Sequence, residues 1–141
     1  KRMKNLYSTL FILLFSWGSA QADLGITAVY DATLSGGTPK GVELYATNDI
    51  ADLSLFGLGS ANNGSGADTV EFTFPAVAVT AGTYLYVASD STRFNEFFGF
   101  FPDYRSNAMG INGDDAIVLL QNGTVIDVFG DINTDGTDEP W

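Results

Sequence analysis

The stretch Asp115-Ala-Ile-Val-Leu-Leu-Gln-Asn-Gly-Thr-Val-Ile-Asp-Val-Phe-Gly130 contains two apolar runs that are separated by Asn122-Gly123. Asn-Gly in this setting predicts a β-hairpin, because a type I′ turn needs a positive φ at both central residues. With Gln121 opposite Thr124, the register pairs Leu119 with Ile126 and Ile117 with Val128, which makes one face wholly aliphatic. The other face would pair Val118 with Asp127, Leu120 with Val125 and Ala116 with Phe129. A lone hairpin is not stable in water, so the upstream chain must supply a partner sheet.

The chain before this hairpin alternates between short apolar segments and turns. Period-two patterns predict strands at residues 24–30, 41–46, 53–58, 70–74 and 83–88, separated by segments rich in Gly, Asn and Pro. Asp90 or Ser91 can cap a short helix that runs to Phe98, with Gly99 just after its end. Many short strands and one short helix predict an all-β fold, an antiparallel β-sandwich in one domain.

The N-terminal segment has the three parts of a secretory signal peptide in order. Lys4 gives a positive start after Met3, Leu6 to Phe15 is a short apolar run, and Ala20-Gln21-Ala22 fits the cleavage site. We therefore expect residues 1–22 to be removed, with Met3 as the start of translation, and residues 23–141 to form the domain. This predicts a secreted protein, extracellular or periplasmic, with no membrane segment after cleavage. A buried N-terminal helix is the alternative.

Charge and composition limit the chemistry that the mature chain can perform. Residues 23–141 keep all 17 acidic residues but only three of the six basic ones, which gives a formal net charge of −14. This surface repels phosphate, so we expect no direct binding to nucleic acid. The chain has no histidine and no cysteine, which excludes Ser-His-Asp and Cys-His nucleophilic sites and the usual zinc sites. A carboxylate pair for glycoside hydrolysis, drawn from Glu43, Glu71, Glu96 and the aspartates, stays an alternative.

The segment after the hairpin, Asp131-Ile-Asn-Thr-Asp-Gly136, matches the first half of a calcium-binding loop. In such a loop, side-chain oxygens at positions 1, 3 and 5 converge on the ion and glycine at position 6 permits the sharp turn. The predicted ligands are therefore Asp131, Asn133 and Asp135, with the Thr137 carbonyl at position 7 and Glu139 at position 9. The acidic ligand of position 12 would lie beyond Trp141. An Asx-rich surface turn that binds no ion is the alternative.

Six aromatic residues lie close together in the predicted helix and the segment after it: Phe94, Phe97, Phe98, Phe100, Phe101 and Tyr104. Because phenylalanine is costly to leave in contact with water, we expect most of them to close one end of the sandwich. The alternative is a surface that faces a protein or glycan partner.

Four stretches, taken in their order and spacing, resemble the lamin-tail domain of secreted bacterial proteins. They are Val42-Glu-Leu-Tyr45, Ile50-Ala-Asp-Leu-Ser-Leu-Phe-Gly-Leu58, Ala81-Gly-Thr-Tyr-Leu-Tyr-Val-Ala88, and Asn112-Gly-Asp-Asp-Ala-Ile-Val-Leu119 with the hairpin to Asp131. The resemblance covers residues 24–131, and it departs at Leu55-Phe56, where the family commonly has Gly-Trp.

The resemblance implies an immunoglobulin-like sandwich without catalytic residues of its own. Domains of this type are often found at the N-terminus of extracellular nucleases, ahead of an endonuclease/exonuclease/phosphatase domain. It therefore implies an accessory or interaction module whose partner is a downstream domain of the same polypeptide, with a C-terminus truncated at Trp141. A calcium-dependent adhesion or carbohydrate-binding module is the alternative function.

Overall fold

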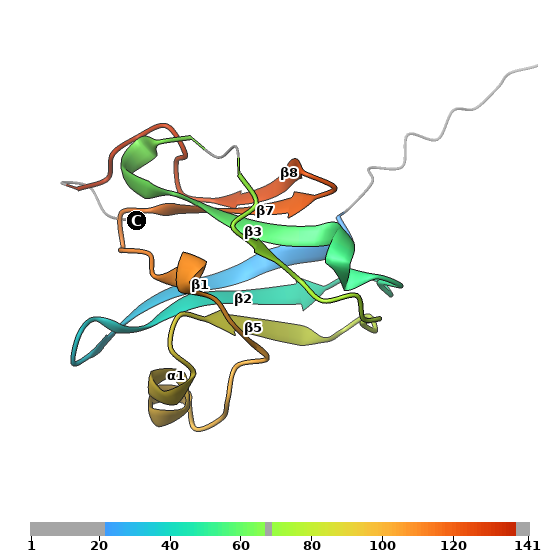
Figure 1. The fold of residues 1–141 in the computed structure, drawn as a ribbon, viewed down its shortest axis with the longest axis horizontal. Helices are drawn as coiled ribbons and strands as arrows, with labels where there is room; N and C mark the ends of the chain where they lie inside the picture. Colours follow the sequence, from blue (N-terminus) through green and yellow to red (C-terminus); the bar gives the residue numbers. More distant parts are fainter. Residues whose placement is uncertain (1–21, 67–68, 138–141) are drawn as a thin grey trace, which may run out of the picture.

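The computed structural model describes residues 22–66 and 69–137 (Figure 1). Residues 1–21 of the predicted signal peptide, and the predicted ligand Glu139, lie outside this part of the chain. The elements in chain order are β1 (Leu24–Leu34), β2 (Thr38–Ala46), η1 (Leu53–Leu55), β3 (Phe56–Ala61), η2 (Asn62–Gly64), β4 (Phe72–Thr73), β5 (Tyr84–Ala88), α1 (Ser91–Phe98), β6 (Tyr104–Arg105), η3 (Asn107–Met109), β7 (Ala116–Gln121) and β8 (Thr124–Phe129). None of the helices described is long and apolar enough to cross a membrane.

The strands form two four-stranded sheets, which Figure 1 shows as two layers. The first sheet has the order β1-β2-β5-β6 and the second sheet has the order β4-β3-β7-β8. Neighbouring strands are antiparallel, except that the two-residue β6 runs parallel to β5. The predicted class, mostly β with antiparallel strands and one short helix, is confirmed.

The hydrophobic core lies between the two sheets. Leu24, Val42, Leu44, Leu85 and Val87 enter it from the first sheet, and Phe56, Leu58, Ile117 and Leu119 from the second. Connecting segments add Phe74, Met109 and Ile111. Two sheets that bury the inner faces of their strands in one common core make a β-sandwich.

The β7–β8 hairpin has the predicted turn but not the predicted register throughout. Asn122 and Gly123 have φ values of 51° and 75°, as a type I′ turn requires. Gln121 pairs with Thr124 and Leu120 with Val125, as expected. Beyond that point, β8 contains one extra residue, so Leu119 faces Asp127, Val118 faces Val128 and Ile117 faces Phe129. The predicted pairs of Leu119 with Ile126 and of Ile117 with Val128 are therefore wrong.

The extra residue is a β-bulge at Ile126, and it changes which side chains point inward. Because a bulge shifts the strand by one residue, Ile126 and Phe129 both pack against the core, whereas Val125 and Val128 are exposed. The bulge also directs Asp127 toward β1, where its Oδ2 accepts a hydrogen bond of 2.8 Å from the Ile26 N–H. This bond joins the edge of the second sheet to the edge of the first.

Three other predicted strands differ from the observed ones. A register shift near Thr27 breaks the regular alternation of β1, and Ile26 and Val29 are the side chains that pack against the core beside Leu24. The segment predicted as a strand at 53–58 begins instead with η1, because the Asp52 carboxylate accepts hydrogen bonds from the Ser54 N–H and hydroxyl. In the segment predicted as a strand at 70–74, only Phe72 and Thr73 pair.

Helix α1 begins and ends where the sequence predicts. Asp90 caps its start by accepting hydrogen bonds from the N–H groups of Thr92 and Arg93, and Gly99 ends it with a φ of 82°. The Phe94 ring contacts Tyr30 and Tyr86, with centroid distances of 5.6 and 5.8 Å. These tyrosines lie on the face of the first sheet that points away from the second sheet, so α1 covers that outer face.

The aromatic cluster therefore does not close the end of the sandwich as predicted. Phe94 is fully buried against the outer face of the first sheet, and Tyr104 packs against Phe72 and Phe74 at the core. The other four phenylalanines are exposed: Phe97, Phe98, Phe100 and Phe101. Phe98 and Phe100 contact the tyrosines of this face, with centroid distances of 5.4 Å to Tyr30 and 5.0 Å to Tyr86, so the cluster packs over the face of the sheet while parts of these rings stay exposed.

Candidate functional site

Three loops meet at one end of the sandwich: Asn62–Gly66, Asn112–Asp115 and the predicted calcium loop 131–137. Gly66 N–H donates a hydrogen bond of 2.8 Å to the Ile132 carbonyl. Gly64 has a φ of +71°, and a Cβ placed on it would lie 2.6 Å from the Thr134 carbonyl carbon. A Cβ on Gly136 would lie 3.0 Å from the Asp114 carbonyl oxygen. Glycine at these positions therefore permits the three backbones to approach closely.

Asp115 lies beneath these loops and is only 3% exposed. Its Oδ1 accepts a hydrogen bond from the Asn63 N–H (3.1 Å) and its Oδ2 accepts one from the Asn112 N–H (2.8 Å). The Asp115 N–H returns a bond to the Asn112 carbonyl. A buried carboxylate is stable when hydrogen bonds replace its hydration, and here those bonds fix two loops to the start of β7.

The predicted carboxylate ligands in the acidic loop accept hydrogen bonds from other residues of the same loop. Asp131 accepts hydrogen bonds from the Asn133 N–H and the Thr134 hydroxyl, and these bonds hold the pKa of Asp131 below its ordinary value. Asp135 accepts bonds from the hydroxyl and the N–H of Thr137, which lower the pKa of Asp135. Both carboxylates are thus held ionised in Asx turns, and each carboxylate oxygen retains further acceptor capacity.

Asp131, Asn133, Asp135 and Thr137 lie in one short loop after β8. Across residues 22–66 and 69–137, no group of three or more His, Cys, Asp or Glu side chains is placed to hold a metal ion. Since Asn133 and the Thr137 carbonyl are not of these types, calcium binding by this loop stays a prediction.

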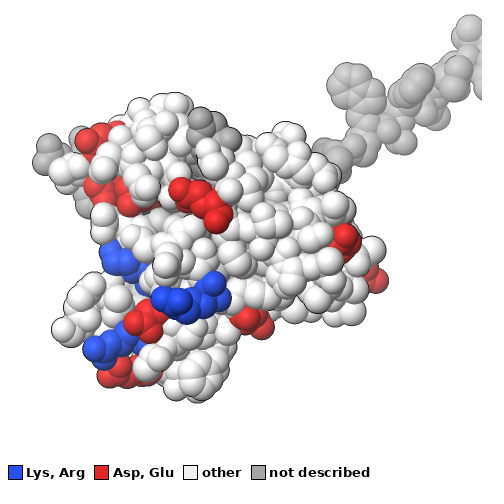
Figure 2. Space-filling model, in the orientation of Figure 1, with Lys and Arg blue, Asp and Glu red and all other residues white. Residues whose placement is uncertain are grey.

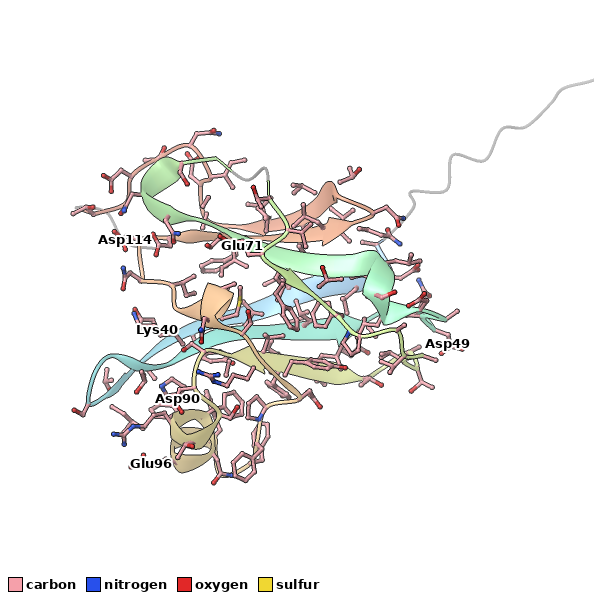
Figure 3. The ribbon with its side chains drawn as sticks, viewed as in Figure 1. Lys40, Asp49, Glu71, Asp90, Glu96 and Asp114 are labelled. Atoms are coloured by element: carbon pink, nitrogen blue, oxygen red, sulfur yellow. The ribbon has the colours of Figure 1, made fainter. Side chains whose placement is uncertain are left out.

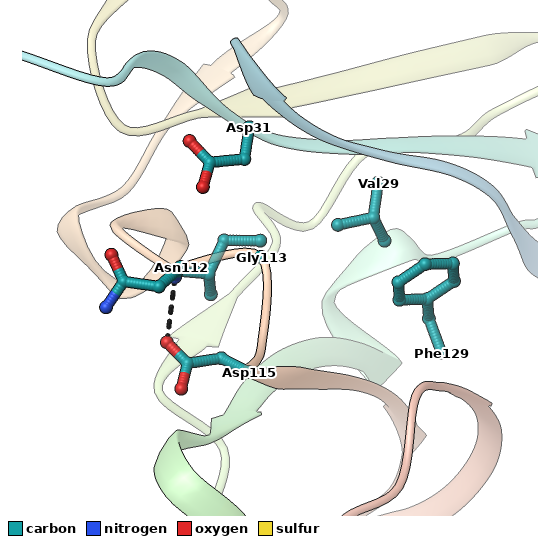
Figure 4. A pocket seen from close by; sticks show the side chains of 7 residues that line it. Val29, Asp31, Asn112, Gly113, Asp115 and Phe129 are labelled. Atoms are coloured by element: carbon teal, nitrogen blue, oxygen red, sulfur yellow. Dashed lines mark hydrogen bonds between the residues drawn. The ribbon is translucent and has the colours of Figure 1, made fainter. Parts of the chain in front are cut away.

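A cavity of about 260 Å³ opens beside the Asn112–Asp115 loop, between that loop and β1. Its lining combines apolar side chains with polar ones: Val29, Ile111 and Phe129, and Asp31, Asn112 and Asp115. Figure 4 shows Asp31 and Asn112 near one another on one side, with Val29 and Phe129 beyond them. Lys40 lies next to this cavity, and its Nζ is 2.9 Å from Asn112 Oδ1 and 3.3 Å from Asp31 Oδ1.

The sequence did not predict this group of Lys40, Asp31 and Asn112. The three residues come from β2, β1 and the loop before β7, so only the fold brings them together. The one available signal was that Lys40 is the only lysine after Lys4.

Carboxylates across the described residues mainly hold the backbone in place. Backbone N–H groups donate to the side chains of Asp49, Asp52, Glu71, Asp90, Asp103, Asp115, Asp127, Asp131 and Asp135. Figure 3 labels Asp49, Glu71 and Asp114 at separate places in the fold, whereas Asp90 and Glu96 both belong to α1, as its N-cap and in its last turn. These acids therefore do not converge on one reacting point.

The four exposed phenylalanines Phe97, Phe98, Phe100 and Phe101, which we call the aromatic surface, lie on α1 and the segment after it. Their exposed fractions are 47%, 40%, 42% and 67%. The basic residues of the described chain are Lys40, Arg93 and Arg105; Arg93 lies in α1, and Lys40 contacts Asn112. Figure 2 shows acidic side chains both near the loops at the upper left and beside α1 at the lower left.

Tyr30 connects α1 to the first sheet beneath the aromatic surface. Its hydroxyl donates a hydrogen bond of 2.9 Å to the Val87 carbonyl, and its ring packs against Phe94 and Phe98. Burial, followed by the nearby Glu43 carboxylate, raises the pKa of Tyr30 well above its usual value. The hydroxyl is therefore a neutral donor that fixes the position of the helix.

Comparison of this chain with protein-family models, with curated proteins and with solved structures finds no match.

Proposed function

We propose that residues 23–141 form a non-catalytic interaction module of a secreted bacterial protein, with a lamin-tail-like, immunoglobulin-like sandwich. The aromatic surface is the observation that carries the proposal. Four neighbouring phenylalanines in contact with water are unusual on a soluble domain, and exposed apolar patches of this kind mark interaction sites. The proposed occupant is a downstream domain of the same polypeptide, and the proposed parent protein is an extracellular nuclease.

The position of the lamin-tail-like stretches supports this proposal. The stretch from Val42 lies in β2, the stretch from Ile50 enters β3 through η1, the stretch from Ala81 contains β5, and the last stretch contains β7. The resemblance therefore rests on central strands of both sheets. The aromatic surface lies on α1 and the segment after it, and both lie outside these stretches.

The use of the carboxylates supports a non-catalytic role. A general acid or nucleophile needs a carboxyl group that is available to the substrate. Here Glu71 accepts from both the N–H and the hydroxyl of Ser60, and Glu96 pairs with Arg93 at 2.6 Å. Glu43 accepts a bond from the Thr27 hydroxyl. The acids that were candidates for glycoside hydrolysis thus have structural partners.

The activity test uses the purified domain and supercoiled plasmid DNA at physiological salt. We expect neither cleavage nor tight binding, because the net charge of −14 opposes the approach of phosphate. Glu71→Gln and Glu96→Gln serve as matched controls for contamination. Cleavage that survives rigorous purification and disappears in either variant would show that the domain is an enzyme.

The alternative, a calcium-dependent adhesion or carbohydrate-binding module, rests on the match of residues 131–136 to the first half of a calcium-binding loop. An ion that binds only the folded protein raises its stability by about 2.7 kcal/mol at a hundredfold excess over Kd. The melting temperature should therefore rise in millimolar calcium relative to chelator, and Asp131→Ala/Asp135→Ala should remove the rise. The chain should be extended by about twenty residues to complete the 12-residue loop. An equal shift in the double variant, or no shift in the extended parent, rules out this loop as a calcium site.

A further inference from the structure

The side chains of Lys40, Asn112 and Asp31 form a compact group of an amine, an amide and a carboxylate. Lys40 Nζ donates a hydrogen bond of 2.9 Å to Asn112 Oδ1 and lies 3.3 and 3.4 Å from the two oxygens of Asp31. The amine is thus in contact with the amide carbonyl on one side and with the carboxylate on the other. This is the arrangement of a nucleophile, an electrophile and a general base.

The surroundings hold this group in place. The Lys40 side chain is 14% exposed and the Asp31 side chain is 31% exposed. A Cβ on Gly37 would lie 3.7 Å from Lys40 Cε, so the turn between β1 and β2 covers the lysine. Val29, Ile111 and Phe129 line the adjoining cavity. Asp31 and Asn112 are the exposed members of the group, and the Asn112 backbone is held by the Asp115 carboxylate.

We propose that Lys40 and Asn112 join in an intramolecular isopeptide bond, with Asp31 as the proton carrier. Asp31 takes one proton from the Lys40 ammonium, and the neutral Nζ attacks Asn112 Cγ. The new N–C bond forms, the Cγ–Nδ2 bond breaks, and the leaving nitrogen receives the proton held by Asp31 and a second proton from the attacking nitrogen. The products are a secondary amide and one ammonium ion, and Asp31 returns to its starting state. The reaction requires no oxidant, metal or cofactor.

The bond would connect the two halves of the sandwich. Lys40 lies in β2 of the first sheet, and Asn112 lies in the loop that leads into β7 of the second sheet. The two residues are 72 positions apart in the sequence. A covalent link across so long a segment restricts the unfolded chain strongly, as a disulfide does, and this chain has no cysteine to form one.

The test is the intact mass of the purified mature protein, followed by peptide mapping. We expect a mass lower than that of the sequence by one ammonia molecule, and a branched peptide that joins Lys40 to Asn112. Lys40→Arg keeps the positive charge but removes the nucleophilic amine, and Asn112→Ala removes the electrophile, so both should have the full mass. Asp31→Asn keeps the shape of the side chain and should form the bond slowly or not at all. The melting temperature of Lys40→Arg should be lower by more than about 10 °C.

A succinimide at an Asn-Gly sequence loses the same mass, and the chain has such sequences at Asn63, Asn112 and Asn122. A succinimide needs no lysine, so its mass loss would persist in Lys40→Arg and would give no branched peptide. The proposal is therefore overturned by a full mass in the parent protein, or by a mass loss that Lys40→Arg retains. Because the first result is measured on the parent protein, it does not depend on whether any variant folds.

Discussion

At the scale of single residues, many acidic side chains of this protein accept hydrogen bonds from backbone N–H groups. Aspartates accept hydrogen bonds from N–H groups at turns, at the start of α1 and at the edge of β1. The sequence alone predicted the cap at Asp90, because capping depends on neighbours that are close in sequence. It did not predict Asp115 or Asp127, whose partners Asn63 and Ile26 lie far away along the chain. When the partner of a carboxylate lies far away in the sequence, its role can therefore be seen only in the folded structure.

Asp127 is the clearest case for a stability measurement. Replacing it by alanine leaves the Ile26 N–H without its acceptor, and a hydrogen bond to a charged group contributes about 1.5–3 kcal/mol. We expect Asp127→Ala to lower the free energy of unfolding, measured in urea, by about 2 kcal/mol. The neighbouring Val128→Ala, at an exposed position, should change it by less than about 0.5 kcal/mol. Equal effects of the two substitutions would contradict the role of Asp127 as a link between sheets.

Asp135 allows a prediction about pH. Hydrogen bonds from the Thr137 hydroxyl and N–H lower the pKa of Asp135 from its ordinary value of 3.8. The unfolded chain therefore binds this proton more readily than the folded chain does. The resulting stability is complete above about pH 4 and is lost as the pH falls below that value. Urea unfolding between pH 3 and 6 should show a shallower loss of stability for Asp135→Asn than for the parent, and identical slopes would argue against these bonds.

At the scale of elements, the sequence predicted the β7–β8 turn and both ends of α1, but it did not predict η1, the bulge in β8 or the exposure of the phenylalanines. Turn residues predicted the positive φ values of Asn122 and Gly123, and a cap and a glycine predicted both ends of α1. The bulge at Ile126 was not predicted from the sequence; it accompanies a hydrogen bond that Asp127 accepts from β1 of the other sheet, a partner that lies far away along the chain. The exposure of Phe97 to Phe101 was also missed, since hydrophobicity indicates burial but does not say which surface is covered.

A substitution at Gly64 tests whether the acidic loop packs on η2. Gly64 and Gly66 both have a positive φ, so alanine is strained at either position. Only at Gly64 would the added Cβ meet the backbone of Thr134 and Asp135, whereas nothing lies within 4 Å of a Cβ at Gly66. We expect Gly66→Ala to cost about 1 kcal/mol in urea unfolding, and Gly64→Ala to cost clearly more. Equal costs would mean that the acidic loop does not rest on Gly64.

At the scale of the whole molecule, one end of the sandwich and the outer face of the first sheet differ in character. The loops around Asp115 and Asp131 form an acidic end, whereas α1, on the outer face, carries the aromatic surface near Arg93 and Arg105. A formal net charge of −14 on residues 23–141 opposes contact with phosphate or anionic surfaces. We propose that the exposed phenylalanines, with Arg93 and Arg105 nearby, are the surface that contacts another part of the polypeptide.

The central claim is that the aromatic surface contacts a downstream domain, and hydrogen exchange of residues 91–105 tests it most directly. The exchange should be slower in the full exported protein than in the isolated domain 23–141, because contact protects α1 and the segment after it. Phe97→Ser/Phe101→Ser should remove this difference, whereas Val125→Ser/Val128→Ser, at exposed positions of β8, should leave it unchanged. Equal exchange in the exported protein and the isolated domain, or protection that persists in Phe97→Ser/Phe101→Ser, would contradict the claim.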